Sequence, residues 1–105
     1  MSNLVNMPGK LQFVYIIRPF KENFAETATE SENEIMGLHF NYLKEMLAEG
    51  KLILAGPETT GKFGLCVIET ESEQEARNMM ENDPAVRSQI VSAELYPYRV
   101  SLIRK

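Results

Sequence analysis

The residues best suited to chemistry in this sequence are His39 and Asp83. His39 is the only histidine, and histidine is the side chain that most readily acts as a general acid or base near neutral pH. An aspartate that accepts a hydrogen bond from one imidazole nitrogen fixes the tautomer and leaves the other nitrogen free to react. His39 can equally be a neutral core histidine, and Asp83-Pro84 can simply begin a helix. Spacing alone does not decide whether the two side chains meet.

Four further residues are candidates for substrate binding. Arg18 ends an apolar segment and offers a bidentate fork to a carboxylate or phenolate, although such an arginine can also lie on a solvated strand end. Gly56 and Pro57 form either a plain turn or a pocket wall where a ligand approaches the backbone. Tyr15 lies among aromatic and branched residues and belongs either to the core or to the lining of a pocket.

The sequence offers little for metal or redox chemistry. Cys66 is the only cysteine, so we expect no intrachain disulfide and no cysteine-based metal site. It lies in the apolar run Leu65–Ile68, where a thiol behaves as a small buried hydrophobic group. With one histidine and one cysteine, we expect neither a metal nor another cofactor.

Length and charge exclude several classes of function. A chain of 105 residues is the size of one domain with a modest core. The net charge of −4 argues against nucleic-acid binding, and the scattered basic residues argue against a membrane-surface role. No apolar run approaches the roughly 18 residues of a membrane span, and the first residues do not resemble a signal peptide. We therefore expect a cytoplasmic protein.

His39 lies within a predicted amphipathic helix, Glu34–Gly50. Its apolar residues cover an arc of roughly 200°, because helical residues are about 100° apart. His39 lies near the middle of that arc, so it should face the core or a pocket. The outward side is expected to carry Glu34, Asn41, Lys44, Glu45 and Ala48. A capping box at Thr29–Glu32 should begin the helix, and Gly50 should end it.

The remaining elements alternate with this helix. A second helix is predicted over Ser72–Asn82, begun by a second capping box at Ser72–Glu75. Pro97 suggests that the last strand lies at an edge or contains a bulge. Period-two patterns and apolar runs predict four strands, Leu11–Arg18, Lys51–Ala55, Phe63–Thr70 and Ile90–Ile103.

The order of these elements is β-α-β-β-α-β, the ferredoxin-like α+β pattern. It predicts an antiparallel sheet with strands one and three in the centre and both helices on one face. Strand one is apolar on both faces, so we expect a homodimer, or a higher homo-oligomer, that packs sheet against sheet. The domain should span residues 11–105, with residues 1–10 as a flexible lead-in.

Several short motifs follow one another in an order that resembles a known family, the YciI-like (YCII-related) proteins. These motifs are His39 with Tyr42-Leu43, then Glu49–Leu52, Ala55–Pro57, Ser72–Ala76, Asp83-Pro84 and Tyr96–Arg99. The resemblance implies a dimeric α+β barrel and an active site formed by His39 and Asp83. It also implies kinship with muconolactone-isomerase-like and dehydrochlorinase-like enzymes. The connection Phe20–Thr29 is longer than compact members need, and it is a candidate for a lid or a pocket wall.

Together these observations predict a small, cofactor-free enzyme that acts on a small cyclic or aromatic molecule. His39 would move a proton in an isomerisation or elimination beside a carbonyl, and Asp83 would orient it. Arg18 or the Gly56 backbone would hold an anionic oxygen. The alternatives are a non-catalytic dimeric module that binds a small molecule or assists another protein, and a structural dimer with a buried, satisfied histidine. Contact between His39 and Asp83 at an open cleft would favour the enzyme.

Overall fold

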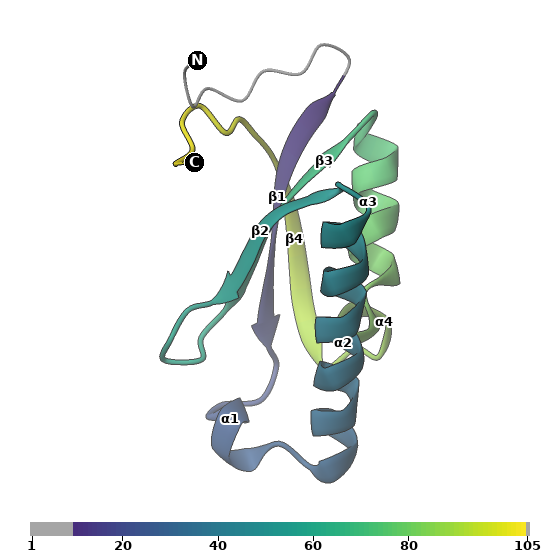
Figure 1. Ribbon diagram of the computed structural model, residues 1–105. Helices are drawn as coiled ribbons and strands as arrows, with labels where there is room; N and C mark the ends of the chain where they lie inside the picture. The colour runs from purple at the N-terminus through teal and green to yellow at the C-terminus, as the bar shows by residue number, and fades with distance from the viewer. Residues whose placement is uncertain (1–9, 105) are drawn as a thin grey trace.

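The computed structural model describes residues 10–104, so the predicted lead-in, apart from Lys10, lies outside the described residues. The chain forms one four-stranded sheet with its two long helices on one side (Figure 1). Its elements are β1 (Leu11–Pro19), α1 (Phe24–Thr27), α2 (Glu30–Ala48), β2 (Leu52–Pro57), β3 (Gly64–Thr70), α3 (Glu73–Asn82), α4 (Pro84–Arg87) and β4 (Val91–Tyr98).

The strand order β2-β3-β1-β4, antiparallel throughout, is that of the ferredoxin-like α+β fold. The predicted fold class is therefore confirmed, with β1 and β3 in the centre. β4 is an edge strand, which is where Pro97 is tolerated because it cannot donate a hydrogen bond to a second neighbour. Tyr15, in the middle of β1, pairs with Cys66 of β3 and Leu95 of β4.

Local signals in the sequence fix where the helices begin. Thr29 and Glu32 form the complete capping box of α2, and Gly50 adopts a left-handed φ of 78° just beyond this helix. The second box is only half formed. Ser72 accepts from the Glu75 backbone N–H, but the Glu75 side chain accepts from the backbone of Glu71 rather than from that of Ser72.

The two faces of the sheet bury different amounts of apolar surface. The main core lies between the sheet and α2, α3 and α4, and it includes Phe13, Tyr15, Ile17, Leu43 and Met80. On the far face, a smaller cluster of Val14, Val67 and Val100 is joined by the partly buried Ile16, Ile53, Leu65 and Ile103. β1 is thus apolar on both sides, as its sequence indicates.

Several predicted element ends differ from the structure: α2 already begins at Glu30, and β2 continues through Gly56 and Pro57. The last strand ends at Tyr98, not Ile103, because Tyr98 pairs with Gln12 near the start of β1 and almost no partner strand remains beyond it. The Val100 backbone instead donates to the Gln12 side chain at 2.7 Å. The connection Phe20–Thr29, expected to be irregular, contains the single helical turn α1.

None of the helices within residues 10–104 has both the length and the apolar character needed to cross a membrane.

Candidate active site

Asp83 lies at the junction between α3 and α4. Its residue ends α3 and begins α4, and its Oδ1 accepts from the Ala85 backbone N–H at 2.9 Å. Pro84 occupies the first position of α4, where its missing N–H costs nothing. The Asp83-Pro84 pair therefore does restart a helix, as one of the two readings of the sequence proposed.

Asp83 is also the centre of a buried hydrogen-bond cluster. The residue is 0% exposed, and its carboxylate oxygens lie 2.8 Å from His39 Nδ1. The Tyr15 hydroxyl donates to Oδ2, also at 2.8 Å. A carboxylate that accepts from a phenol, a backbone N–H and an imidazole has a partner for each oxygen, which is what burial of a charged group requires. Asp83 thus both begins α4 and contacts His39.

Tyr15 acts as a fixed donor in this cluster. Burial, with the Cys66 thiol and the Asp83 carboxylate beside it, raises the pKa of Tyr15 above its usual value. The hydroxyl therefore keeps its proton and donates a hydrogen bond to Asp83. An ionised carboxylate can only accept, so in the neutral form of the imidazole the Asp83 contact favours a proton on Nδ1 and leaves Nε2 as an acceptor.

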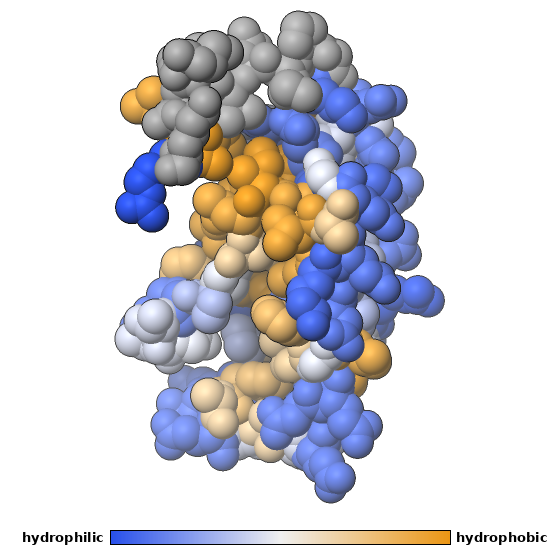
Figure 2. Space-filling model, viewed as in Figure 1, coloured by the Kyte–Doolittle hydropathy of each residue, from blue (hydrophilic) through white to orange (hydrophobic). Residues whose placement is uncertain are grey.

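His39 separates the buried cluster from an open cavity. Its side chain is 12% exposed, and it lines a cavity of about 660 Å3 between α2 and the β2–β3 side of the sheet. Figure 2 shows hydrophobic side chains gathered in the middle of the molecule, over β2 and the adjoining flank of α2. Because Nδ1 lies against Asp83, Nε2 is the ring nitrogen that remains for a molecule in the cavity to contact.

The cavity wall consists mostly of apolar side chains. Leu43, Leu52 and Cys66 form its buried part, whereas Phe40, Leu47 and Leu54 are about half exposed. The volume lies within the range of small-molecule sites, about 300–1,000 Å3. Burial raises the pKa of the Cys66 thiol to about 12, so Cys66 contributes a neutral, unreactive surface. Within the part of the chain that the structure describes, no group of three acidic, histidine or cysteine side chains is placed to hold a metal ion.

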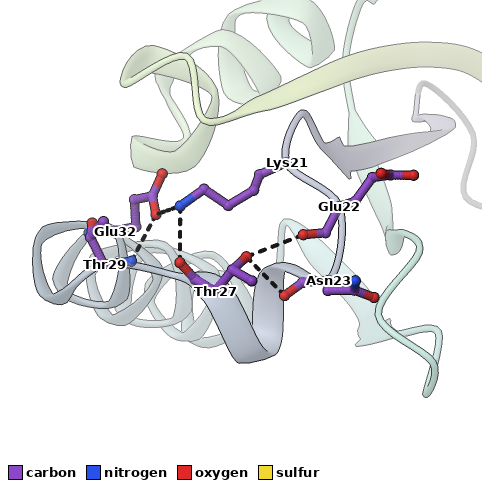
Figure 3. A network of polar contacts seen from close by, with 6 residues as sticks. All are labelled: Lys21, Glu22, Asn23, Thr27, Thr29 and Glu32. Carbon is purple, nitrogen blue, oxygen red and sulfur yellow. Dashed lines mark hydrogen bonds and ion pairs between the residues drawn. The ribbon is translucent and has the colours of Figure 1, made fainter.

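One end of the cavity is bordered by α1. Phe24 and Ala25 of this single turn line the cavity, although none of the α1 side chains is buried. Figure 3 shows the polar contacts that tie this segment to α2: Lys21 Nζ donates to the Thr27 carbonyl at 3.0 Å and to Glu32 Oε1 at 2.7 Å. The connection Phe20–Thr29 therefore forms part of the pocket wall.

The structure brings some of the candidate residues together and separates others. His39 and Asp83 are in contact, and Gly56 and Pro57 line the cavity. Tyr15 does not line it but holds Asp83 from beneath. Arg18 lies on the other face of the sheet, because it alternates with Ile17, and it forms an ion pair with Glu94. Arg18 is therefore not placed to hold an anion in this cavity.

Sequence reasoning missed two kinds of pocket residue. Lys44, expected on the outward side of α2, is exposed but also borders the cavity. It lies one turn after Phe40, with Nζ 5.2 Å from the centre of that ring, so its position relative to His39 could have been read from helical periodicity. Phe24 and Phe63 come from connections without a periodic pattern, and no signal in the sequence marks them as pocket residues.

The sequence also matches a known protein family. The model of the YCII-related domain matches residues 12–99, almost the whole described chain. The chain belongs to the YCII-related family. This confirms the resemblance carried by the short motifs around His39, Gly56 and Asp83. Comparison with the curated proteins gives no significant match.

Several solved structures share the fold of this chain. The 5-chloro-2-hydroxyhydroquinone dehydrochlorinase TftG from Burkholderia phenoliruptrix AC1100, in complex with 2,5-dihydroxybenzoquinone, has a TM-score of 0.63 and 18% identity, over 83% of this chain and 93% of that one. The protein YjcS has a TM-score of 0.53 and 15% identity, over 88% and 99%. Rv0793 from Mycobacterium tuberculosis has a TM-score of 0.50 and 9% identity, over 88% and 97%. The fold of this chain is thus shared by these three proteins.

Proposed function

We propose that this YCII-related protein is a cofactor-free enzyme that uses His39 and Asp83 for acid–base chemistry on a small cyclic or aromatic molecule. The observation that carries the proposal is the position of the imidazole. Its Nδ1 lies 2.8 Å from a buried carboxylate, and the same ring lines an apolar cavity of about 660 Å3. A histidine that served packing alone would not need to border an open cavity.

The arrangement suits proton transfer at a carbon beside a carbonyl group. Nε2 accepts a proton from the ring carbon, and Asp83 stabilises the imidazolium that forms. In an isomerisation the imidazolium returns the proton to another carbon of the same ligand. In a dehydrochlorination the C–Cl bond breaks as the C–H electron pair forms the new double bond, chloride leaves, and the imidazolium releases the proton to water. Neither reaction requires an external oxidant or reductant.

Two further observations agree with a ring-shaped ligand. Apolar side chains dominate the cavity wall, and TftG, which shares the fold, is a dehydrochlorinase described in complex with a dihydroxybenzoquinone. The second candidate function is a non-catalytic module that binds such a molecule. It is favoured by the exposed apolar wall of Phe40, Leu47 and Leu54, which would bind a ring whether or not the ring reacts.

We also propose that two copies of the chain pack through the far face of the sheet. The support is the second apolar cluster around Val14 and Val67, with Ile16 and Leu65 only partly buried there. Light scattering at micromolar concentration should give twice the mass of one chain. A Leu65→Glu variant should shift the mass toward that of one chain, whereas a monomeric wild-type protein would contradict the proposal.

The test of the catalytic role begins with a screen for ligands. Small phenols, lactones and chlorinated ring compounds are tested for thermal stabilisation of the protein, and those that bind are then tested for turnover. For any compound that is converted, His39→Ala should lower kcat by about 10²–10⁴-fold, the usual contribution of general acid–base catalysis. Unchanged thermal unfolding of the variant would show that its fold is retained.

The outcomes separate the two candidate functions. Full turnover by His39→Ala would overturn the acid–base role. Compounds that stabilise the wild type and the variant alike, without conversion by either, would favour the binding module. Lys51→Met is a suitable control, because Lys51 pairs with Glu49 on the surface and does not line the cavity.

A further inference from the structure

The cavity carries charge at only one place besides the His39–Asp83 pair. Among the described side chains that line it, Lys44 is the one with a full positive charge, and the others are apolar apart from His39 and the neutral Cys66 thiol. Within residues 10–104, Lys44 has no carboxylate within ion-pair distance, unlike Lys10, Lys21 and Lys51. Its ammonium group lies 5.2 Å from the centre of the Phe40 ring instead. The cation is therefore free to meet an anion at the cavity.

Helix geometry places Lys44 and His39 at opposite margins of the same wall. Five residues along a helix correspond to about 140° of rotation and about 7.5 Å of rise. Leu43, Leu47 and Phe40 fall between these two positions around the helix axis, and all three line the cavity. A flat ligand that lies on this apolar stripe would have the imidazole at one margin and the ammonium group at the other.

The attraction of Lys44 for an anion would have to be local. The chain carries a net charge of −4, so its overall field does not favour negatively charged ligands. Arg18, which the sequence also suggested as an anion-binding residue, lies on the far face of the sheet and is paired with Glu94. Lys44 is thus the residue through which this cavity can distinguish an anionic ring compound from a neutral one.

We propose that Lys44 binds a carboxylate or ionised phenol oxygen on the ligand, and that the substrates of the His39 site are small ring compounds bearing such an anion away from the reacting carbon. This proposal rests on the proposed function for the identity of the reacting end. The binding interaction itself can be measured without turnover. Lys44 is a specificity-determining residue in this scheme, and its ammonium group does not take part in proton transfer.

The test uses two probes of the same shape, 2-naphthoate and the neutral 2-naphthamide. Equilibrium binding to the full chain is followed by naphthyl fluorescence at low and high salt. The wild type should bind 2-naphthoate more tightly, and Lys44→Met should weaken that binding about three- to tenfold, as expected for loss of a partly exposed charge-assisted contact. Affinity for 2-naphthamide should stay constant, and added salt should weaken only the naphthoate complex.

Two matched variants make the result specific. Lys44→Arg keeps the charge and should retain the preference for 2-naphthoate. Lys51→Met removes one positive charge from outside the cavity and should leave both affinities unchanged. Equal weakening of 2-naphthoate binding by Lys44→Met and Lys51→Met would overturn the proposal, since it would reveal only a general charge effect. Equal binding of the two probes by the wild type would overturn it as well.

The catalytic proposal fails separately. His39→Ala should keep the Lys44-dependent preference for 2-naphthoate, because the anion lies at the other margin of the cavity. If that preference persists while His39→Ala retains full turnover of a converted compound, the anion site stands and the acid–base role falls. Loss of the preference in His39→Ala, with the fold intact, would contradict the separation of the two ends.

Discussion

Two regions beneath α2, the hydrogen-bond cluster around Asp83 and the apolar wall of the cavity, differ in how deeply they are buried. In the cluster, Asp83 and Tyr15 are completely buried, and each polar group has a partner. In the cavity wall, Phe40, Leu47 and Leu54 are about half exposed to solvent. The same helix contributes to both. The cluster thus stabilises the fold and fixes the orientation of its side chains, whereas the cavity wall leaves apolar surface uncovered.

This difference explains why His39 is placed where it is. A side chain that must keep a fixed orientation needs rigid partners, and the buried carboxylate provides them. The cavity leaves another side of the same side chain open. His39 lies on the boundary between the two regions, with one ring nitrogen toward each.

Replacement of Asp83 should have the largest effect on stability. Asp83→Ala leaves the Tyr15 hydroxyl, the Ala85 N–H and the imidazole without their shared partner. Loss of one member of a buried polar cluster costs about 3–5 kcal/mol, which urea denaturation would measure as a lower free energy of unfolding. Glu81→Ala, an exposed neighbour with the same change of charge, should stay within about 0.5 kcal/mol of the wild type. If Asp83→Ala lowered the free energy of unfolding by less than about 1 kcal/mol, the cluster would not be a major source of stability.

Two leucines of α2 allow the buried and the exposed parts of the cavity wall to be compared directly. Leu43 is 8% exposed and Leu47 is 55% exposed, and both line the cavity. Leu43→Ala should lower the free energy of unfolding by about 2–5 kcal/mol, as buried leucines do. Leu47→Ala should lower it by less than about 1 kcal/mol but weaken the binding of 2-naphthamide. Similar losses of stability in the two variants would mean that the cavity wall is closed rather than open.

Removal of the Tyr15 hydroxyl should have a smaller effect. Tyr15→Phe keeps the packing at the centre of β1 and removes the hydrogen bond to Asp83, which should cost about 1–3 kcal/mol because the acceptor is charged and buried. Tyr98→Phe, at a half-exposed tyrosine on β4, should be neutral in the same denaturation experiment. Equal effects of the two substitutions would contradict the role of Tyr15 in holding the carboxylate.

The same variant should change the alkaline limit of stability. The folded state raises the pKa of Tyr15 above the usual value near 10, and that of Tyr42 to about 12. Their contribution to the free energy of unfolding is complete below pH 10 and is lost as pH rises toward the raised pKa values. Tyr15→Phe should therefore lose less stability than the wild type between pH 10 and pH 12, measured by denaturation at each pH.

The sequence predicted the fold because its signals are local. Alternation in Leu11–Arg18, the box at Thr29–Glu32 and Gly50 all act within a few residues, and each is found as expected. The last strand was overextended because its alternating pattern continues past Tyr98, whereas its length is set by the partner β1. A strand boundary of this kind depends on a segment about 85 residues away in the chain, as the pairing of Gln12 with Tyr98 shows.

The candidate site was predictable in part for the same reason. The amphipathic pattern shows that His39 faces inward, and the alternation of β1 already places Arg18 opposite Tyr15 and Ile17, away from the helices. The contact between His39 and Asp83 depends on how α4 packs against α2, which no local pattern encodes. The cavity depends on the half-exposed Phe40 and Leu47, which the sequence cannot distinguish from fully packed residues of the same helix.

Asp83 both caps helices and contacts His39, which affects what its presence in a related sequence indicates. Because the residue ends α3, begins α4 and accepts from Tyr15, we expect it to be needed for the fold in relatives with or without the proposed chemistry. An aspartate at this position in a related protein is therefore weak evidence that the relative has the proposed activity. His39 caps no helix, and its side-chain hydrogen-bond partner among the described residues is Asp83, so a histidine at this position is the better indicator of the proposed chemistry.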